Sequence, residues 1–204
     1  IVGAYSYLQR ATPPTSSTAT TTSQMLSDGT VITGLPEGAV VTEDTSVPRV
    51  SAPDYRAPVA YEASVSAEVR AAIEPRFAAD VALLTKNSQN FSAWMDLAIL
   101  HKIGGDYQRA AAIWGYVSLA WPKDTLAFNN LGDLYMNFLK DYPKAEQSYK
   151  KVITLNPGYI DAYRNLYTLY HYQYKVGTGA DAAIVAQGLK ANPNNPDLLQ
   201  LQAQ

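Results

Sequence analysis

The chain has 204 residues with 16 basic and 18 acidic side chains, so its formal net charge is −2. This balance lacks the basic surplus of nucleic-acid-binding proteins, and we expect no nucleic-acid partner. The absence of cysteine excludes disulfides, thiolate metal sites and cysteine nucleophiles. The two histidines, His101 and His171, leave little for metal binding or general-base catalysis. We therefore expect a protein that is not an enzyme and that carries no metal or cofactor.

Residues 1–65 differ in composition from the rest of the chain. They contain three arginines, six acidic residues and no lysine, whereas all three tryptophans and eleven of the fifteen tyrosines follow residue 90. Residues 12–23 read TPPTSSTATTTS and offer too little apolar surface to offset the entropy of ordering. Such a tract is also typical of an O-glycosylated stalk. We expect residues 1–65 to form an extended arm or linker rather than a domain with its own core.

Two short runs in this arm are β-prone. Residues 30–33 read TVIT, residues 39–42 read AVVT, and the GLPEG between them favours a hairpin or a bent extended segment. Their adjacent apolar residues would lie on both faces of a strand, and the arm has too little apolar material to cover both. We expect the cover to come from another copy of the chain, docked through Val31, Ile32, Val40 and Val41.

The first ten residues, IVGAYSYLQR, resemble the end of a signal peptide or of a membrane anchor. Together with the Ser/Thr-rich tract and the absence of cysteine, this resemblance favours an exported protein. We expect an extracellular or cell-surface location, with the periplasm as an alternative. A cytosolic protein is the remaining possibility.

Beyond residue 90 the sequence repeats with a period of 34 to 36 residues. Trp94, Phe128 and Tyr163 stand 34 and 35 residues apart. Four more columns keep this register: Leu97, Leu131 and Leu166; Ala110 and Ala145; Trp114, Tyr149 and Val185; Pro122, Pro157 and Pro193. Each unit has two segments with apolar residues at helical spacing, separated by a break, which predicts two helices per unit.

These units resemble the tetratricopeptide repeat family. The matching patterns are W-x2-L-A-x2-H, F-x2-L-G-x2-Y and Y-x2-L-Y-x2-Y, with the endings LAWP, TLNP and KANP. The resemblance implies an all-α domain over residues 66–204, a short α-solenoid of three helix pairs. Its expected parts are an N-terminal cap at 66–90, repeats at 91–124, 125–159 and 160–194, and a C-terminal cap at 195–204.

The resemblance further implies a concave groove, lined by the first helix of each unit, that binds a peptide. The matching positions in this chain are Met95, Ile99, Lys102, Ile103, Leu126, Asn129, Asp133, Met136, Arg164, Thr168 and His171. Family members that bind the acidic tails of chaperones need basic or amide side chains where Met95, Ile99 and Asp161 stand here. We therefore expect a different partner.

Single positions refine this interpretation. Gly132 and Ala98 are the small residues that let two helices approach closely, whereas Tyr167 takes that column in the third unit. His101 stands in the column of Tyr135 and Tyr170, which predicts a packed core histidine rather than a catalyst.

The function expected from these features is structural. We expect an exported interaction protein that binds other copies of itself through the arm, as the subunit of an extracellular filament. The alternative is a membrane-anchored scaffold whose groove binds a peptide of another protein.

Overall fold

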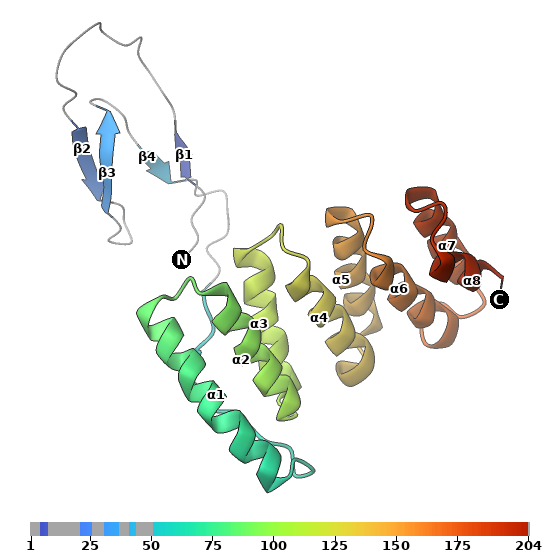
Figure 1. Cartoon of the computed structure of the whole chain (residues 1–204), viewed down its shortest axis with the longest axis horizontal. Helices are drawn as coiled ribbons and strands as arrows, with labels where there is room; N and C mark the ends of the chain where they lie inside the picture. Colours follow the sequence, from blue (N-terminus) through green and yellow to red (C-terminus); the bar gives the residue numbers. More distant parts are fainter. Residues whose placement is uncertain (1–4, 8–20, 26–30, 37–40, 44–50, 204) are drawn as a thin grey trace, which may run out of the picture. The chain divides into compact units, whose positions relative to one another are not determined.

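A computed structural model describes residues 5–7, 21–25, 31–36, 41–43 and 51–203, with side chains in residues 51–203 only. The chain forms two compact units, Ile1–Val50 and Ser51–Gln204. The described parts of the first unit are strands, and those of the second are helices with their connections (Figure 1).

Two short antiparallel ribbons make up the described part of the first unit. β1 (Tyr5–Tyr7) pairs with β4 (Val41–Glu43), and β2 (Thr21–Met25) pairs with β3 (Val31–Pro36). The second ribbon has an irregularity in register between Thr22 and Gln24. The β2–β3 ribbon is therefore nested in sequence between the two strands of the other.

The prediction of a hairpin between residues 30–33 and 39–42 is wrong, because these two runs do not pair with each other. β3 and β4 include most of these two runs, but each pairs with an earlier segment of the chain. Only five residues separate β2 from β3, a length that suits a hairpin loop, and the threonines of the Ser/Thr-rich tract favour strands. Of the expected docking residues, Val31 and Ile32 lie in β3 and Val41 begins β4, whereas Val40 lies outside the described residues.

Residues 51–203 confirm the expectation of an all-α domain. Their α-helices are α1 (Ala67–Lys86), α2 (Phe91–Ile103), α3 (Tyr107–Ala120), α4 (Leu126–Leu134), α5 (Tyr142–Leu155), α6 (Ile160–Tyr172), α7 (Ala180–Ala191) and α8 (Pro196–Gln202). A π-helical turn, Tyr135–Leu139, follows α4 directly. Each helix packs against the next one along the chain, and Figure 1 shows them following one another through the domain.

Side chains just before several helices fix where these helices begin. Asn90, Asp141 and Asn195 accept hydrogen bonds from backbone N–H groups in the first turns of α2, α5 and α8, at 3.1, 3.2 and 3.1 Å. Such bonds satisfy N–H groups that have no partner within the helix. Ser66 caps α1 in the same way, and that helix continues through Pro75 to Lys86.

The segment before α1 packs on the helices, so the domain boundary differs from the expected one at residue 65. Val59 is 9% exposed and packs with Ile73 and Leu100. The backbone N–H of Glu62 donates to the carbonyl of Gly104 at 2.9 Å. We call residues 54–62 the strap. Its apolar side chains and backbone bonds make it part of the helical unit, although its prolines predicted a linker.

At two glycines, neighbouring helices lie so close together that a larger residue would not fit. A methyl group added at Gly132 in α4 would lie 2.5 Å from the ring of Tyr149 in α5. A methyl group at Gly188 in α7 would lie 3.0 Å from the ring of Tyr163 in α6. Both tyrosines are 1% exposed, so their rings have little room to move.

Gly132→Ala should therefore lower the free energy of unfolding by about 1–3 kcal/mol, because the added methyl group overlaps a buried ring. The matched control is Gly115→Ala in α3, where an added methyl group meets no atom within 4 Å. That change should raise stability by up to about 1 kcal/mol through helix propensity. Urea unfolding of the three proteins measures both effects, and equal changes at the two glycines would contradict this packing.

Candidate functional site

An open hollow lies between α2, α3, α4 and the π turn. Its volume is about 420 Å³. Its lining residues are Ile99, Lys102, Ile103, Tyr107, Trp114, Asn130 and Phe138. We call it the α2–α4 hollow. Ile103 is 47% exposed and Phe138 is 41% exposed, so two large apolar side chains face solvent at its edge.

The charge of the hollow is compensated within the protein. The ammonium of Lys102 donates to the carboxylate of Asp133 and lies 4.8 Å from the centre of the Phe138 ring. The side-chain amide of Asn137 donates to the other oxygen of the same carboxylate at 2.7 Å. Lys102 is the charged residue among those that line the hollow, so the surface offered to a ligand is apolar with a neutralised cation.

One polar group in the lining has no partner among the described residues. Trp114 is 1% exposed, and its indole N–H makes no hydrogen bond there. A buried donor without a partner costs about 1–3 kcal/mol.

The π turn places Phe138 at the hollow. Its wider winding is followed by Lys140 in the left-handed region at φ 55°, after which Asp141 caps α5. The ring of Phe138 packs on that of Tyr107, with centroids 4.8 Å apart. Because π turns are frequent at functional sites, this local departure from the α-helix supports a role for the hollow.

The expected groove residues divide into those that line the hollow and those that do not. Ile99, Lys102 and Ile103 line it, and Asp133 joins it through Lys102. Met95 and Met136 are 8% and 5% exposed and belong to the core, which corrects their expected place in an open groove. Leu126 is exposed, Asn129 and Thr168 are half-buried, and Arg164 is exposed and pairs with Asp161 at 3.2 Å.

Four residues of the hollow were not expected from the sequence: Tyr107, Trp114, Asn130 and Phe138. Trp114 belongs to a repeated column and was expected in the core, where it does lie. Tyr107 and Phe138 lie outside the repeated columns. The Asn-Asn pair at residues 129–130 interrupts the apolar pattern of α4. This interruption is the sequence feature from which a polar residue in the hollow could have been predicted.

His171 lies apart from the hollow, at the end of α6. Its Nδ1 is 2.7 Å from Oδ2 of Asp181, and its ring stacks on that of Tyr167 with centroids 5.1 Å apart. The hydrogen bond from His171 lowers the pKa of Asp181. Tyr172 is 64% exposed beside it.

Two buried polar groups connect helices rather than face a cavity. His101 is 1% exposed, as expected for a core residue, and its Nδ1 is 2.8 Å from Oδ2 of Asp106. Burial lowers the pKa of His101, so its ring is neutral at pH 7. Burial would raise the pKa of Glu146, but hydrogen bonds from Lys150, Lys175 and Tyr170 outweigh it and hold the pKa at about 2.

In residues 51–203, no three His, Asp or Glu side chains come together in a group that would hold a metal ion. Within the described parts of the chain, no helix is long and apolar enough to cross a membrane. Neither a known protein family nor a curated protein matches the chain.

A buried carboxyl joins α1 to α2. Asp80 is 6% exposed, and its Oδ2 has no hydrogen-bond partner in residues 51–203. Burial raises the pKa of Asp80 to about 7, the neighbouring Asp96 carboxylate adds to the rise, and Arg76 opposes it. Between about pH 4 and pH 7 the folded chain therefore retains a proton that the unfolded chain has released, so stability falls as the pH rises from about 4 to about 7.

Asp80→Asn should remove this pH dependence, because an amide cannot ionise. Relative to the wild type, the variant should gain about 4 kcal/mol of stability between pH 4 and pH 8. Urea unfolding across this range provides the measurement, with the exposed Asp161→Asn as a control that keeps the wild-type slope. An unchanged slope in Asp80→Asn would show that this carboxyl ionises normally.

Proposed function

We propose that this chain is a non-enzymatic protein-interaction protein that assembles with other copies of itself. In this proposal its helical unit is a short α-solenoid of three tetratricopeptide-like helix pairs, and its N-terminal segment docks on neighbouring copies. The observation that carries the proposal is the α2–α4 hollow, an open surface of about 420 Å³ with exposed apolar side chains.

The helix boundaries support the solenoid. The pairs α2–α3, α4–α5 and α6–α7 fall within the three expected repeats, and each pair packs on the next. α1 and α8 fall within the expected caps. A single helix pair cannot bury its apolar faces alone. Neighbouring pairs therefore stack on one another and share a common core.

The composition of the N-terminal segment suits the hollow. Residues 11–36 contain a single charged side chain, that of Asp28, together with the apolar Met25, Leu26, Val31 and Ile32. An uncharged segment meets no unpaired charge at Lys102, whose ammonium is paired with Asp133.

The ribbons of the first unit support assembly in a second way. Two-stranded ribbons are marginally stable alone, and a strand with one partner presents a second edge of N–H and C=O groups. Each of the described strands pairs with one other strand. A strand from another copy would add to such an edge. Because a contact between arm and body is heterologous, its repetition leads to an open helical filament unless it closes into a ring.

The internal pairing of the same strands favours a second candidate. Since β1 pairs with β4 and β2 with β3, these segments already satisfy part of their backbone hydrogen bonds without another copy. The hollow would then accept an uncharged peptide of another protein, and the chain would serve as an exported scaffold, anchored at the cell surface or in the periplasm.

Replacing Ile103 and Phe138 together by aspartate should abolish assembly, because two charges would face the docked apolar segment. Both side chains are more than 40% exposed, so the fold should survive the change. The control is Leu119→Asp, since Leu119 is 60% exposed on α3 and does not line the hollow. Sedimentation velocity of the full chain measures the outcome: wild type and Leu119→Asp sediment as oligomers, and the double variant as a monomer.

Two results would contradict the proposal. A double variant that assembles like the wild type would exclude the hollow as the docking surface. A wild type that stays monomeric at every concentration would exclude self-assembly and leave the scaffold as the candidate.

A further inference from the structure

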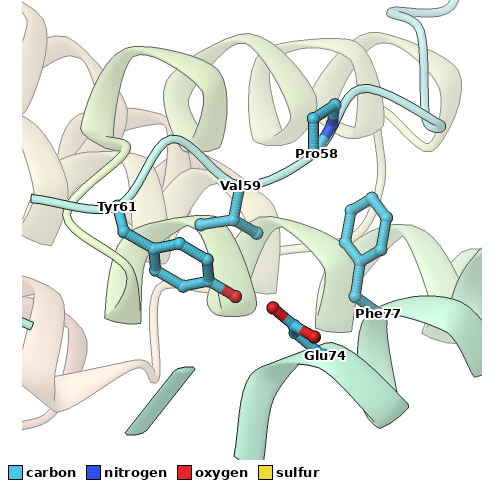
Figure 2. A pocket seen from close by; sticks show the side chains of 5 residues that line it. All are labelled: Pro58, Val59, Tyr61, Glu74 and Phe77. Atoms are coloured by element: carbon cyan, nitrogen blue, oxygen red, sulfur yellow. The ribbon is translucent and has the colours of Figure 1, made fainter. Parts of the chain in front are cut away.

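A second pocket lies under the strap, away from the α2–α4 hollow. Its volume is about 240 Å³, and Pro58, Val59, Tyr61, Glu74 and Phe77 line it. Figure 2 shows the phenol of Tyr61 and the carboxylate of Glu74 pointing toward each other, with Phe77 on the other side of Glu74. Pro58, Val59 and Tyr61 come from the strap, and Glu74 and Phe77 come from α1.

Glu74 is the charged group of this pocket and has no ionic partner. Among residues 51–203 it forms no ion pair or hydrogen bond, and it is exposed. The guanidinium of Arg70, which lies over the Tyr61 ring, donates to the carbonyls of Val65 and Glu62 at 3.1 and 3.3 Å. The pocket thus presents a carboxylate that no protein group neutralises.

The pKa of Tyr61 agrees with the presence of an unneutralised carboxylate in this pocket. Burial raises the pKa of the Tyr61 phenol, the negative charge of Glu74 raises it further, and Arg70 opposes with the smaller effect. Seen from the Tyr61 hydroxyl, the carboxylate therefore outweighs the guanidinium, although Arg70 lies 5.1 Å from the centre of the Tyr61 ring.

We propose that this pocket binds a lysine side chain of a partner protein. The aliphatic stem would pack on Val59, Pro58 and Phe77, as lysine stems do on apolar surfaces. The ammonium would meet the carboxylate of Glu74 beside two aromatic rings, whose faces attract cations.

Lysine fits better than arginine at this pocket. A guanidinium gains much of its affinity from stacking on an aromatic face, whereas an ammonium is a compact charge that needs no such face. One face of Tyr61 already carries the guanidinium of Arg70. The lysine does not come from residues 1–65 of another copy, because these contain none.

The test titrates the full chain with N-acetyl-L-lysine N-methylamide and follows the methyl resonances of Val59 by NMR. N-acetyl-L-norleucine N-methylamide is the uncharged probe with a similar stem. The lysine probe should shift the Val59 methyls saturably and bind about tenfold more tightly than the norleucine probe. Glu74→Gln should abolish this difference, and Asp197→Asn, which removes an exposed carboxylate of α8, should preserve it.

Each other outcome overturns the proposal. Equal affinity for the two probes would mean an apolar pocket without charge recognition, and Glu74→Gln with wild-type affinity would exclude the carboxylate. Tighter binding of N-acetyl-L-arginine N-methylamide would exclude lysine as the preferred side chain. Val59 methyls that do not move up to the solubility limit of the lysine probe would exclude the pocket.

Discussion

The helical unit depends on burying large aromatic rings between helices that lie close together. Tyr149 and Tyr163 are almost fully buried, and each ring occupies the space that a Cβ at a facing glycine would need. Trp94 and Trp114 are likewise buried, in the core between α2 and α3. Since these rings set the spacing of the helices between which they lie, the α2–α4 hollow depends on the same packing.

The sequence allowed the helices and most of their boundaries to be predicted, because the core residues recur at a fixed period and each unit ends at a proline. It also indicated Gly132, which stands in the column of small residues. It did not indicate Gly188, where the small residue lies on the second helix of the pair and faces Tyr163. A repeated column of small residues predicts that two helices lie close together. It does not predict which of the two helices carries the small residue.

The candidate sites were harder to predict. Met95 and Met136 are buried because their helices pack on neighbours along more than one face, so helical spacing alone could not separate groove from core. Phe138 lies in a π turn, where a period of 3.6 residues no longer places side chains. Val59 stands alone among prolines, and its burial depends on Leu100 and Gly104, which are more than 40 residues away in the sequence.

The strap also has a mechanical consequence. A force applied to the residues that precede the strap is transmitted towards α1 through residues 54–62. The attachments of the strap include the Val59 side chain, the hydrogen bond from the N–H of Glu62 to the carbonyl of Gly104, and that from the N–H of Ala60 to Asp106 at 3.3 Å. Release of the strap would uncover Leu100, which packs with Val59 in the folded domain. The strap therefore ties the chain that precedes α1 to α2 and to the turn that follows α2.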